Sequence, residues 1–109
     1  MNLDGVRVPA AQRVGEEGED FKIAMRGLDG GRINIAACSL GGAQFCLEAA
    51  QDYVASRTQF GKPLGALQAM QYKLADMATD LRASRLMVHS ATDALDNWLP
   101  SATAAAAMA

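Results

Sequence analysis

The chain has 109 residues, a formal net charge of −2, and hydrophobic residues at 50% of its positions. This length allows at most one small domain, and the weakly acidic balance argues against a nucleic-acid-binding surface, which is normally strongly basic. No apolar run reaches the roughly 18 residues of a membrane span, and the first residues show no secretory signal. The sequence contains no motif for metal, P-loop or serine-nucleophile chemistry.

The two cysteines, Cys38 and Cys46, fall within one helical pattern. On a helix their spacing corresponds to about 12 Å, which exceeds the roughly 7 Å between Cα atoms that a disulfide can bridge. We therefore expect two reduced thiols in a reducing compartment.

Residues 1–19 are predicted to be extended chain and loop. Leu3, Val6 and Val8 alternate roughly with polar neighbours, Pro9 ends the run, and an acidic turn follows. Residues 6–9 are therefore expected to form the last strand of a sheet. Because a lone strand cannot satisfy its own backbone groups, its partner strands are expected N-terminal to this chain.

Two long helices are predicted over residues 20–97. From Asp20, apolar residues recur at spacings of three and four, as on one buried face of a helix. Residues 57–64 interrupt the pattern with Gly61 and Pro63, and a second helix follows from about Gly65 to Asn97, with spacings typical of a near-antiparallel bundle helix. The stripes comprise Phe21, Met25, Leu28, Ala36, Leu40, Ala43, Leu47, Ala50 and Val54, then Leu67, Met70, Leu74, Met77, Leu81, Ser84, Val88, Ala91 and Leu95.

The predicted fold is thus all-α, a helical hairpin that needs a larger bundle. Each helix has a second, partly apolar side, so two helices cannot bury all of their apolar surface, and further helices are expected from a longer chain or from other subunits. After Trp98-Leu99-Pro100, the remainder is almost all alanine and is expected to be a frayed or irregular tail without chemistry. The second sides carry Ile23, Ile33, Phe45, Tyr72, Leu86 and Met87.

A first candidate site is the segment Leu28-Asp29-Gly30-Gly31-Arg32. One interpretation is an ion pair between Asp29 and Arg32, one helical turn apart. The other is a groove for a ligand chain, opened by the two glycines, in which Asp29 and Arg32 bind the polar atoms of the ligand. For the second glycine pair, Gly41-Gly42, two interpretations stand equally: close packing against another helix, or a functional role.

A second candidate site is the turn between the two predicted helices. Arg57, Thr58, Gln59 and Lys62 gather hydrogen-bond donors there, and Phe60 offers an apolar surface. Cationic side chains around a glycine turn suit a phosphate or pyrophosphate group.

Four blocks of the sequence, in this order, resemble the acyl-CoA dehydrogenase family. They are Val8-Pro9, residues 14–21 (VGEEGEDF), residues 28–32 (LDGGR), and residues 57–64 (RTQFGKPL) followed by Gln68. The resemblance implies a parent with an N-terminal helical domain, a central β-domain and a C-terminal four-helix up-down bundle. Residues 1–19 would end the β-domain, residues 20–97 would form the first two bundle helices, and residues 98–109 would be a divergent alanine-rich tail.

The resemblance also implies FAD-dependent oxidation of an acyl-CoA to the 2,3-enoyl-CoA. The paired glycines are typical of the isobutyryl-CoA dehydrogenase branch, which acts on short branched substrates in valine catabolism. The implied substrate-binding residues are Asp29, Gly30, Gly31 and Arg32. The implied FAD contacts are Arg57, Leu67 and Gln68, bordered by Thr58, Gln59 and Phe60, with the FAD shared with a neighbouring subunit.

No catalytic residue is expected within this chain. The glutamate base of the family lies beyond the second bundle helix, or in some branches at the position that Gly31 occupies here. The chain alone is therefore expected to be inactive. The resemblance further implies a homotetramer, an electron-transfer flavoprotein as electron acceptor, and a mitochondrial matrix location. The alternative hypothesis is a non-catalytic helical module for oligomerisation or interaction.

Overall fold

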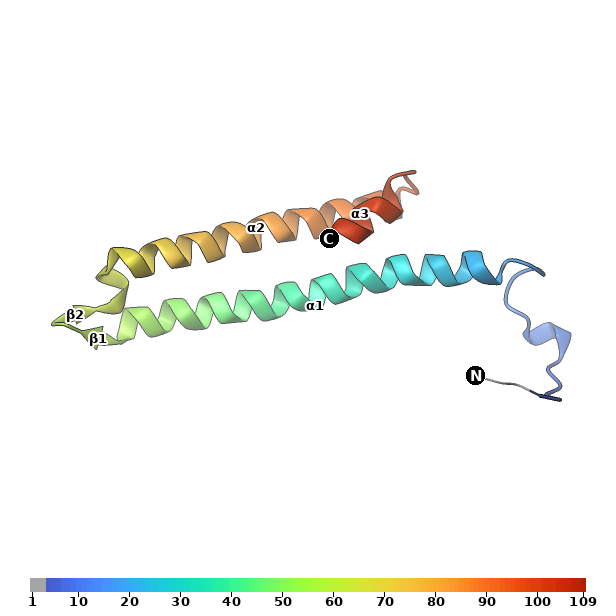
Figure 1. Ribbon diagram of the computed structural model, residues 1–109, viewed down its shortest axis with the longest axis horizontal. Coiled ribbons are helices and arrows are strands. Elements are labelled where there is room, and N and C mark those ends of the chain that lie inside the picture. The colour runs from blue at the N-terminus through green and yellow to red at the C-terminus, as the bar shows by residue number, and fades with distance from the viewer. Residues whose placement is uncertain (1–3) are drawn as a thin grey trace.

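A long helical hairpin dominates the computed structural model, which describes residues 4–109 (Figure 1). Helices α1 and α2 run antiparallel, a short strand pair closes one end, and α3 folds back at the other. The elements are η1 (Ala10–Gln12), α1 (Asp20–Ser56), β1 (Thr58–Gln59), β2 (Lys62–Pro63), η2 (Leu64–Ala66), α2 (Gln68–Asp96) and α3 (Ala102–Met108). The predicted all-α hairpin is confirmed.

Helix α1 continues through both glycine pairs, Gly30-Gly31 and Gly41-Gly42, without a break. Each glycine costs a helix roughly 1 kcal/mol relative to alanine, but 37 residues of continuous backbone hydrogen bonding and the contact with α2 outweigh that cost. Asp20 lies in the first turn, where a carboxylate is favourable beside the positive end of the helix dipole. The helix ends where Arg57 turns to an extended conformation, with φ −77° and ψ 123°.

The core lies along the seam between α1 and α2 and is small. Leu47 is buried on α1, and Leu81 and Val88 are among the buried residues of α2. A single side-chain hydrogen bond crosses the seam among the described residues: Arg85 Nη2 donates to Gln44 Oε1 at 2.8 Å. The apolar stripes predicted from the sequence therefore meet, but only part of each is covered.

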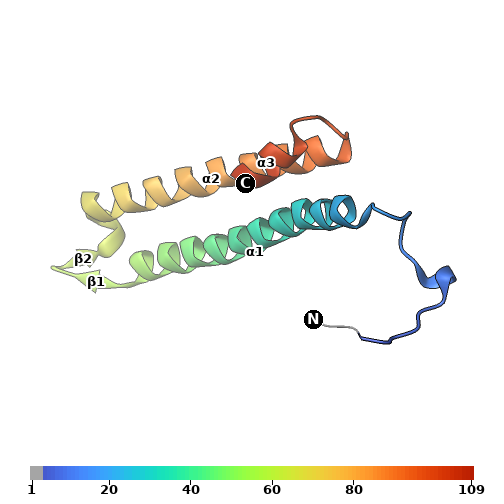
Figure 2. The ribbon, with the colours of Figure 1, turned by 45° about the vertical axis from the view of Figure 1, so that its right-hand side comes forward.

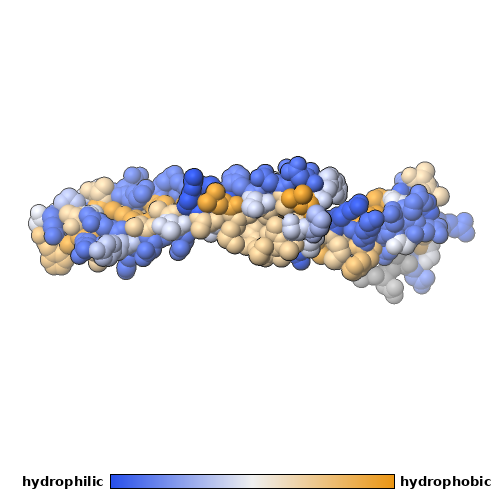
Figure 3. All heavy atoms as spheres, turned by 90° about the horizontal axis from the view of Figure 1, so that it is seen from above, coloured by the Kyte–Doolittle hydropathy of each residue, from blue (hydrophilic) through white to orange (hydrophobic). Residues whose placement is uncertain are grey.

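Large apolar side chains remain exposed on the outer sides of both helices, as the sequence predicted. Phe45 is 71% exposed and Tyr72 is 62% exposed, and Leu86 and Met87 are also exposed. Figure 3 shows hydrophobic residues at the surface along the hairpin, beside polar residues. The radius of gyration is 22.4 Å, whereas a compact domain of this length has about 13 Å. The hairpin thus leaves a large part of its apolar surface exposed.

Helix α2 ends at Asp96 and is followed, after the capping residue Asn97, by a left-handed residue, Trp98, with φ 52°. The N–H of Trp98 donates to the carbonyl of Leu95, and the N–H of Leu99 donates to that of Ala94. This is the hydrogen-bond pattern of a Schellman cap, in which glycine usually takes the left-handed position. The guanidinium of Arg26 lies 5.8 Å from the centre of the Trp98 ring, and this cation–π contact helps to hold the strained residue in place.

The alanine-rich tail is ordered, and the expectation of a frayed segment is wrong. Residues Ala102–Met108 form α3, which folds back against both α2 and α1 (Figure 2). Ala102 and Ala106 are buried. Alanine has the highest helix propensity, and its small side chain permits close approach to two other helices. Alanine alone thus supplies the buried face of this helix.

The predicted strand at residues 6–9 is not formed, and Leu3 lies outside the described residues. Among residues 4–109, the one strand pair is β1–β2, so residues 6–9 have no partner there. The acidic turn that follows is ordered by Arg13, whose guanidinium bonds to Glu16 at 2.9 Å and Glu17 at 3.1 Å. Cys38 and Cys46 are both free thiols, as expected from their spacing.

The glycine pair Gly41-Gly42 provides a test of whether the outer side of α1 is covered. A Cβ added at Gly41 would meet nothing within 4 Å, so Gly41→Ala is expected to stabilise the isolated chain by about 0.5–1 kcal/mol through helix propensity. Urea unfolding followed by circular dichroism measures the change. Loss of stability instead would contradict an open surface at this glycine pair.

Candidate functional site

The two predicted site segments lie far apart on α1. Arg32 is in its first half, and Arg57 follows its last residue. At about 1.5 Å per residue, the two are roughly 38 Å apart along the helix. The structure therefore does not bring the predicted residues into a single site. It forms two separate clusters, one in a groove and one on a turn.

Asp29 is the centre of the first cluster and is mostly buried, with 12% of its side chain exposed. Arg32 Nη1 donates to Asp29 Oδ1 at 2.9 Å, so the ion pair expected from the i,i+3 spacing is present. Thr103 Oγ1 on α3 donates to Asp29 Oδ2 at 2.8 Å. Both carboxylate oxygens thus have a donor, and Arg32 keeps 47% of its side chain exposed.

A groove of about 1230 Å³ runs beside this cluster, between α1, α2 and α3. Gly31 and Arg32 line it from α1, and a Cβ at Gly31 would meet no atom within 4 Å. The absent side chain therefore leaves open space. Most other lining residues are apolar or small, among them Ile35, Leu40, Leu47, Leu81, Val88 and Ala107. Gly30 is not among the lining residues, so the glycine pair contributes to the groove through its second member.

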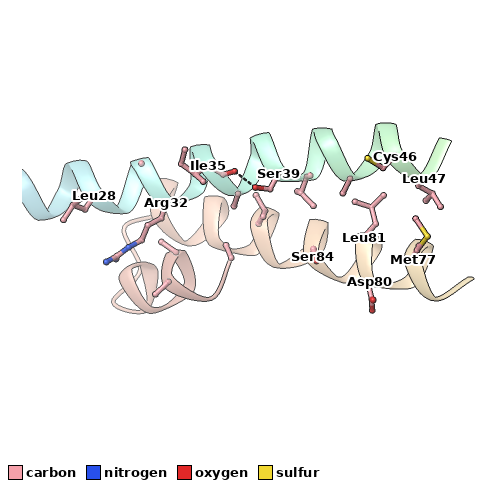
Figure 4. A pocket seen from close by; sticks show the side chains of 18 of the residues that line it. Leu28, Arg32, Ile35, Ser39, Cys46, Leu47, Met77, Asp80, Leu81 and Ser84 are labelled. Atoms are coloured by element: carbon pink, nitrogen blue, oxygen red, sulfur yellow. Dashed lines mark hydrogen bonds between the residues drawn. The ribbon is translucent and has the colours of Figure 1, made fainter. Parts of the chain in front are cut away.

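Figure 4 shows the groove walls from close by. Asp80 lines the groove from α2, but its side chain points away from α1 in this view. Ser39 donates its hydroxyl to the carbonyl of Ile35 within its own helix at 3.0 Å. The groove thus has apolar walls, with Arg32 as a cation at one end, and suits a ligand with an apolar chain and a polar or anionic part.

The second cluster lies on a miniature β-hairpin that the sequence did not predict. Thr58 pairs with Pro63, and Gln59 pairs with Lys62, across a two-residue loop of Phe60 and Gly61. Both loop residues have positive φ, 53° and 76°, as a type I′ turn requires. The N–H of Leu64 donates to the carbonyl of Arg57 at 2.8 Å and closes the turn onto the end of α1.

Phe60 combines a strained backbone with an exposed aromatic ring. It is 88% exposed, and a left-handed conformation costs a residue with a Cβ about 1–2 kcal/mol. Such strain persists where the surroundings hold it and is common at ligand clamps. The side chains of Arg57, Thr58 and Gln59 are exposed on the same turn. The turn therefore offers donors and an aromatic face, but no enclosing wall.

Leu67 and Gln68 follow the turn at the start of α2. Leu67 is half-buried and precedes the first helical residue, Gln68, which is exposed. Gln68 Nε2 donates to the hydroxyl of Tyr72 one turn later at 2.6 Å. Both residues lie close to the turn in the sequence, so the structure places all six predicted FAD contacts at one end of the hairpin.

Sequence reasoning missed the contribution of α3 to the first cluster. The hydroxyl of Thr103 and the groove positions Ala106 and Ala107 come from the segment that was expected to carry no chemistry. No sequence signal links Thr103 to Asp29, because the two residues are 74 positions apart. Within residues 4–109 there is no group of three or more metal-type ligands, and no helix there is long and apolar enough to cross a bilayer.

Comparison with known proteins matches residues 18–109 to the family described as acyl-CoA dehydrogenase, C-terminal domain. The chain belongs to the acyl-CoA dehydrogenase family. The match extends over the alanine-rich segment, so α3 lies inside the region that resembles the family domain. It begins just before α1 and includes both clusters.

Several curated acyl-CoA dehydrogenases are similar to the chain. Mitochondrial isobutyryl-CoA dehydrogenase from Dictyostelium discoideum is 57% identical over 98% of this chain and 26% of the relative. The Bos taurus protein of that name is 51% identical over 94% of this chain and 24% of the relative. Bos taurus mitochondrial short-chain specific acyl-CoA dehydrogenase is 50% identical over 94% of this chain and 25% of the relative. The chain therefore spans about a quarter of the length of these relatives.

Solved structures show the same fold. Butyryl-CoA dehydrogenase from Megasphaera elsdenii superposes with a TM-score of 0.88 at 46% identity, over 93% of this chain and 26% of that one. A structure described as the electron transferring flavoprotein of Acidaminococcus fermentans matches with a TM-score of 0.82 at 48% identity, over 86% and 24%. The helical hairpin of this acyl-CoA dehydrogenase chain is thus also present in solved structures of similar sequence.

The Asp29 cluster predicts a local coupling between α1 and α3. Asp29→Asn removes the charge that both donors share, and hydrogen bonds to a charged group contribute about 1.5–3 kcal/mol. We expect the backbone amides of α3 to exchange with solvent at least about tenfold faster. Hydrogen exchange measured by mass spectrometry or NMR checks this. Asp52→Asn, at an exposed carboxylate on the same helix, is the control, and equal rates in the two variants would contradict the coupling.

Proposed function

We propose that this chain supplies part of the C-terminal helical domain of an FAD-dependent acyl-CoA dehydrogenase that oxidises short branched acyl-CoA to the 2,3-enoyl-CoA. The family match over residues 18–109 carries the proposal. The proposal of a branched substrate rests on the similarity to the two isobutyryl-CoA dehydrogenases, although a short-chain specific relative is nearly as similar. Residues 1–19 would be the end of the central β-domain with its linker, and residues 20–97 the first two bundle helices.

The proposed acyl-CoA site is the groove end at Asp29, Gly30, Gly31 and Arg32. The absent side chain at Gly31 leaves open space, and the apolar groove walls suit an acyl chain. Arg32 offers its remaining N–H donors to polar atoms of the substrate, while Asp29 holds the guanidinium through the 2.9 Å hydrogen bond. Gly31 has no group that accepts a proton, and Asp80 points away from α1, so the base would come from protein outside this chain.

The proposed FAD contacts are Arg57, Thr58, Gln59, Phe60, Leu67 and Gln68. The exposed cation and amides at the turn fit a pyrophosphate, because guanidinium and backbone donors bind phosphate oxygens well. FAD would accept the hydride that leaves the acyl chain. Because the turn has no enclosing wall, a neighbouring subunit would hold most of the cofactor. This arrangement supports a homo-oligomer, with a tetramer as the proposed state.

The wider setting follows from the relatives. A mitochondrial matrix location is proposed from the two mitochondrial isobutyryl-CoA dehydrogenases. An electron-transfer flavoprotein is proposed as electron acceptor, in line with the structure that carries this description. The exposed apolar sides of α1 and α2 favour a second candidate function, a non-catalytic helical module that associates with full-length subunits.

The visible spectrum of the purified intact gene product tests the proposed function. Flavin absorption bands that survive desalting, and that bleach when isobutyryl-CoA is added without air, are the expected result. A colourless protein that nevertheless associates with full-length dehydrogenase subunits would favour the non-catalytic module instead.

Phe60 should matter for FAD retention more than for folding. Phe60→Asn removes the aromatic face, while asparagine tolerates the left-handed conformation that strains phenylalanine. We therefore expect the FAD content after desalting to fall severalfold, with the melting temperature unchanged or slightly higher. Val14→Asn, another exposed apolar loop residue, is the control. Full FAD retention in Phe60→Asn would remove Phe60 from the proposed site.

Gly31 should determine the tolerance for a branched acyl chain. Gly31→Leu adds a side chain where a Cβ meets no atom of the described chain within 4 Å, so the variant is expected to fold. The ratio of kcat/KM for isobutyryl-CoA to that for butyryl-CoA should fall about tenfold, which is typical for one methyl group excluded from a pocket. Gly42→Leu, at an equally open glycine outside the groove lining, should leave the ratio unchanged. Equal losses for both substrates in Gly31→Leu would contradict this role.

A further inference from the structure

We propose that Thr103 is a positioning residue for the acyl-CoA site, an inference that rests on the proposed function of Asp29 and Arg32. Thr103 lies on α3, 74 positions from Asp29, and donates its hydroxyl to Asp29 Oδ2 at 2.8 Å. The other carboxylate oxygen accepts from Arg32 Nη1 at 2.9 Å. The three side chains thus form a chain of contacts in which Asp29 joins a donor from α3 to the cation at the groove.

The hydroxyl of Thr103 restricts the orientation of the Asp29 carboxylate, which has few other hydrogen-bond partners. The Asp29 side chain is only 12% exposed, so solvent offers its oxygens little alternative bonding. With a donor on each oxygen, rotation of the carboxylate about its last side-chain bond would break one hydrogen bond or both. Removing the Thr103 donor leaves a partly buried oxygen without a partner, and a carboxylate is then expected to reorient toward the remaining donor, Arg32.

The direction of the Arg32 guanidinium depends on that carboxylate. Among the described residues, Asp29 accepts the one hydrogen bond that the Arg32 side chain donates. Nearly half of the Arg32 side chain is exposed, so the side chain is otherwise free to move. An arginine held in one orientation binds a polar ligand at a lower entropic cost than a mobile one, because less rotational freedom is lost on binding.

The position of Thr103 is itself fixed by the α2–α3 corner, residues 97–101. Arg26, one helical turn before Asp29, lies against the ring of Trp98, the left-handed residue that caps α2. The α2–α3 corner is thus held on α1 at two neighbouring points, through Trp98 and through Thr103. This double attachment aligns α3 with Asp29 before any ligand arrives, so the Thr103 hydroxyl is preorganised for its role.

The test compares Thr103→Val, Thr103→Ser and Thr79→Val in the intact gene product. Valine matches the shape of threonine without the hydroxyl, and serine restores the donor. Thr79 is an exposed helical threonine whose hydroxyl bonds only to the carbonyl of Ala75 in its own helix, so its variant controls for the substitution itself. The measurements are the dissociation constant of isobutyryl-CoA from flavin spectral changes, the FAD content, the melting temperature, and the mobility of the Arg32 Nε–H group by NMR relaxation.

Thr103→Val should weaken isobutyryl-CoA binding by about fivefold to tenfold, less than the loss of a direct hydrogen bond between a charged group and the ligand would cause, because Thr103 acts only through Asp29 and Arg32. It should also increase the mobility of Arg32. FAD content should not change, because the turn lies at the far end of α1. Thr103→Ser should bind within about twofold of the wild type. A lowered melting temperature with unchanged isobutyryl-CoA binding and unchanged Arg32 mobility would show that Thr103 only joins two helices, and would overturn the proposal.

The same data separate this inference from the proposed function. If wild-type protein binds no isobutyryl-CoA, the proposed function fails, and the positioning role for substrate fails with it. If the wild type binds isobutyryl-CoA and Thr103→Val binds equally well, the proposed function stands and the role of Thr103 alone is rejected.

Discussion

The structure depends on the contact between two amphipathic helices that each carry more apolar surface than the other can cover. Leu47, Leu81 and Val88 are buried along the seam, whereas Phe45 and Tyr72 lie exposed on the outer sides. A large apolar side chain that stays exposed forgoes about 1.5–3 kcal/mol of burial free energy. The elongated shape, with extents of 74 × 33 × 18 Å, follows from this imbalance. Both the groove and the turn lie on surfaces that further protein would complete.

Much of the fold could be predicted because the helices follow from local rules. Apolar spacing identified both long helices, and Gly61 with Pro63 marked the break between them. The first predicted boundary, Asp20, agrees with the structure. The start of α2 is at Gln68 rather than near Gly65, because Leu64–Ala66 forms a 3-10 turn first. Such a turn leaves no distinct pattern in apolar spacing.

Other parts of the fold were not predicted because they depend on contacts or on uncommon residues in special conformations. The type I′ turn at Phe60-Gly61 uses phenylalanine where asparagine or aspartate is usual. The Schellman cap of α2 uses tryptophan where glycine is usual. Helix α3 was missed because its buried face consists of alanines, Ala102 and Ala106. The strand at residues 6–9 was predicted from alternation, but a strand forms only where a partner supplies the second half of its hydrogen bonds.

The candidate site divides in the same way between local and long-range information. The ion pair of Asp29 with Arg32 follows from helix geometry, since residues three apart are neighbours on a helix surface. The gathering of Arg57, Gln59 and Phe60 on one turn follows from their adjacency in sequence. The bond from Thr103 to Asp29 has no such origin, because it exists only once α2 has ended and α3 has turned back. Tertiary structure alone could reveal it.

The two clusters differ in what they need from the rest of an enzyme. The groove already has walls from three helices, so a ligand there would meet preformed apolar surface and one cation held by Asp29. The turn has no walls, so a ligand there would be held mainly by another polypeptide. Helix α3 contacts both α1 and α2 and bonds to Asp29. The same segment therefore supplies the third wall of the groove and one of the two hydrogen bonds on the carboxylate that holds the cation there. The alanine-rich segment thus completes the groove, whereas nothing in the described chain completes the turn.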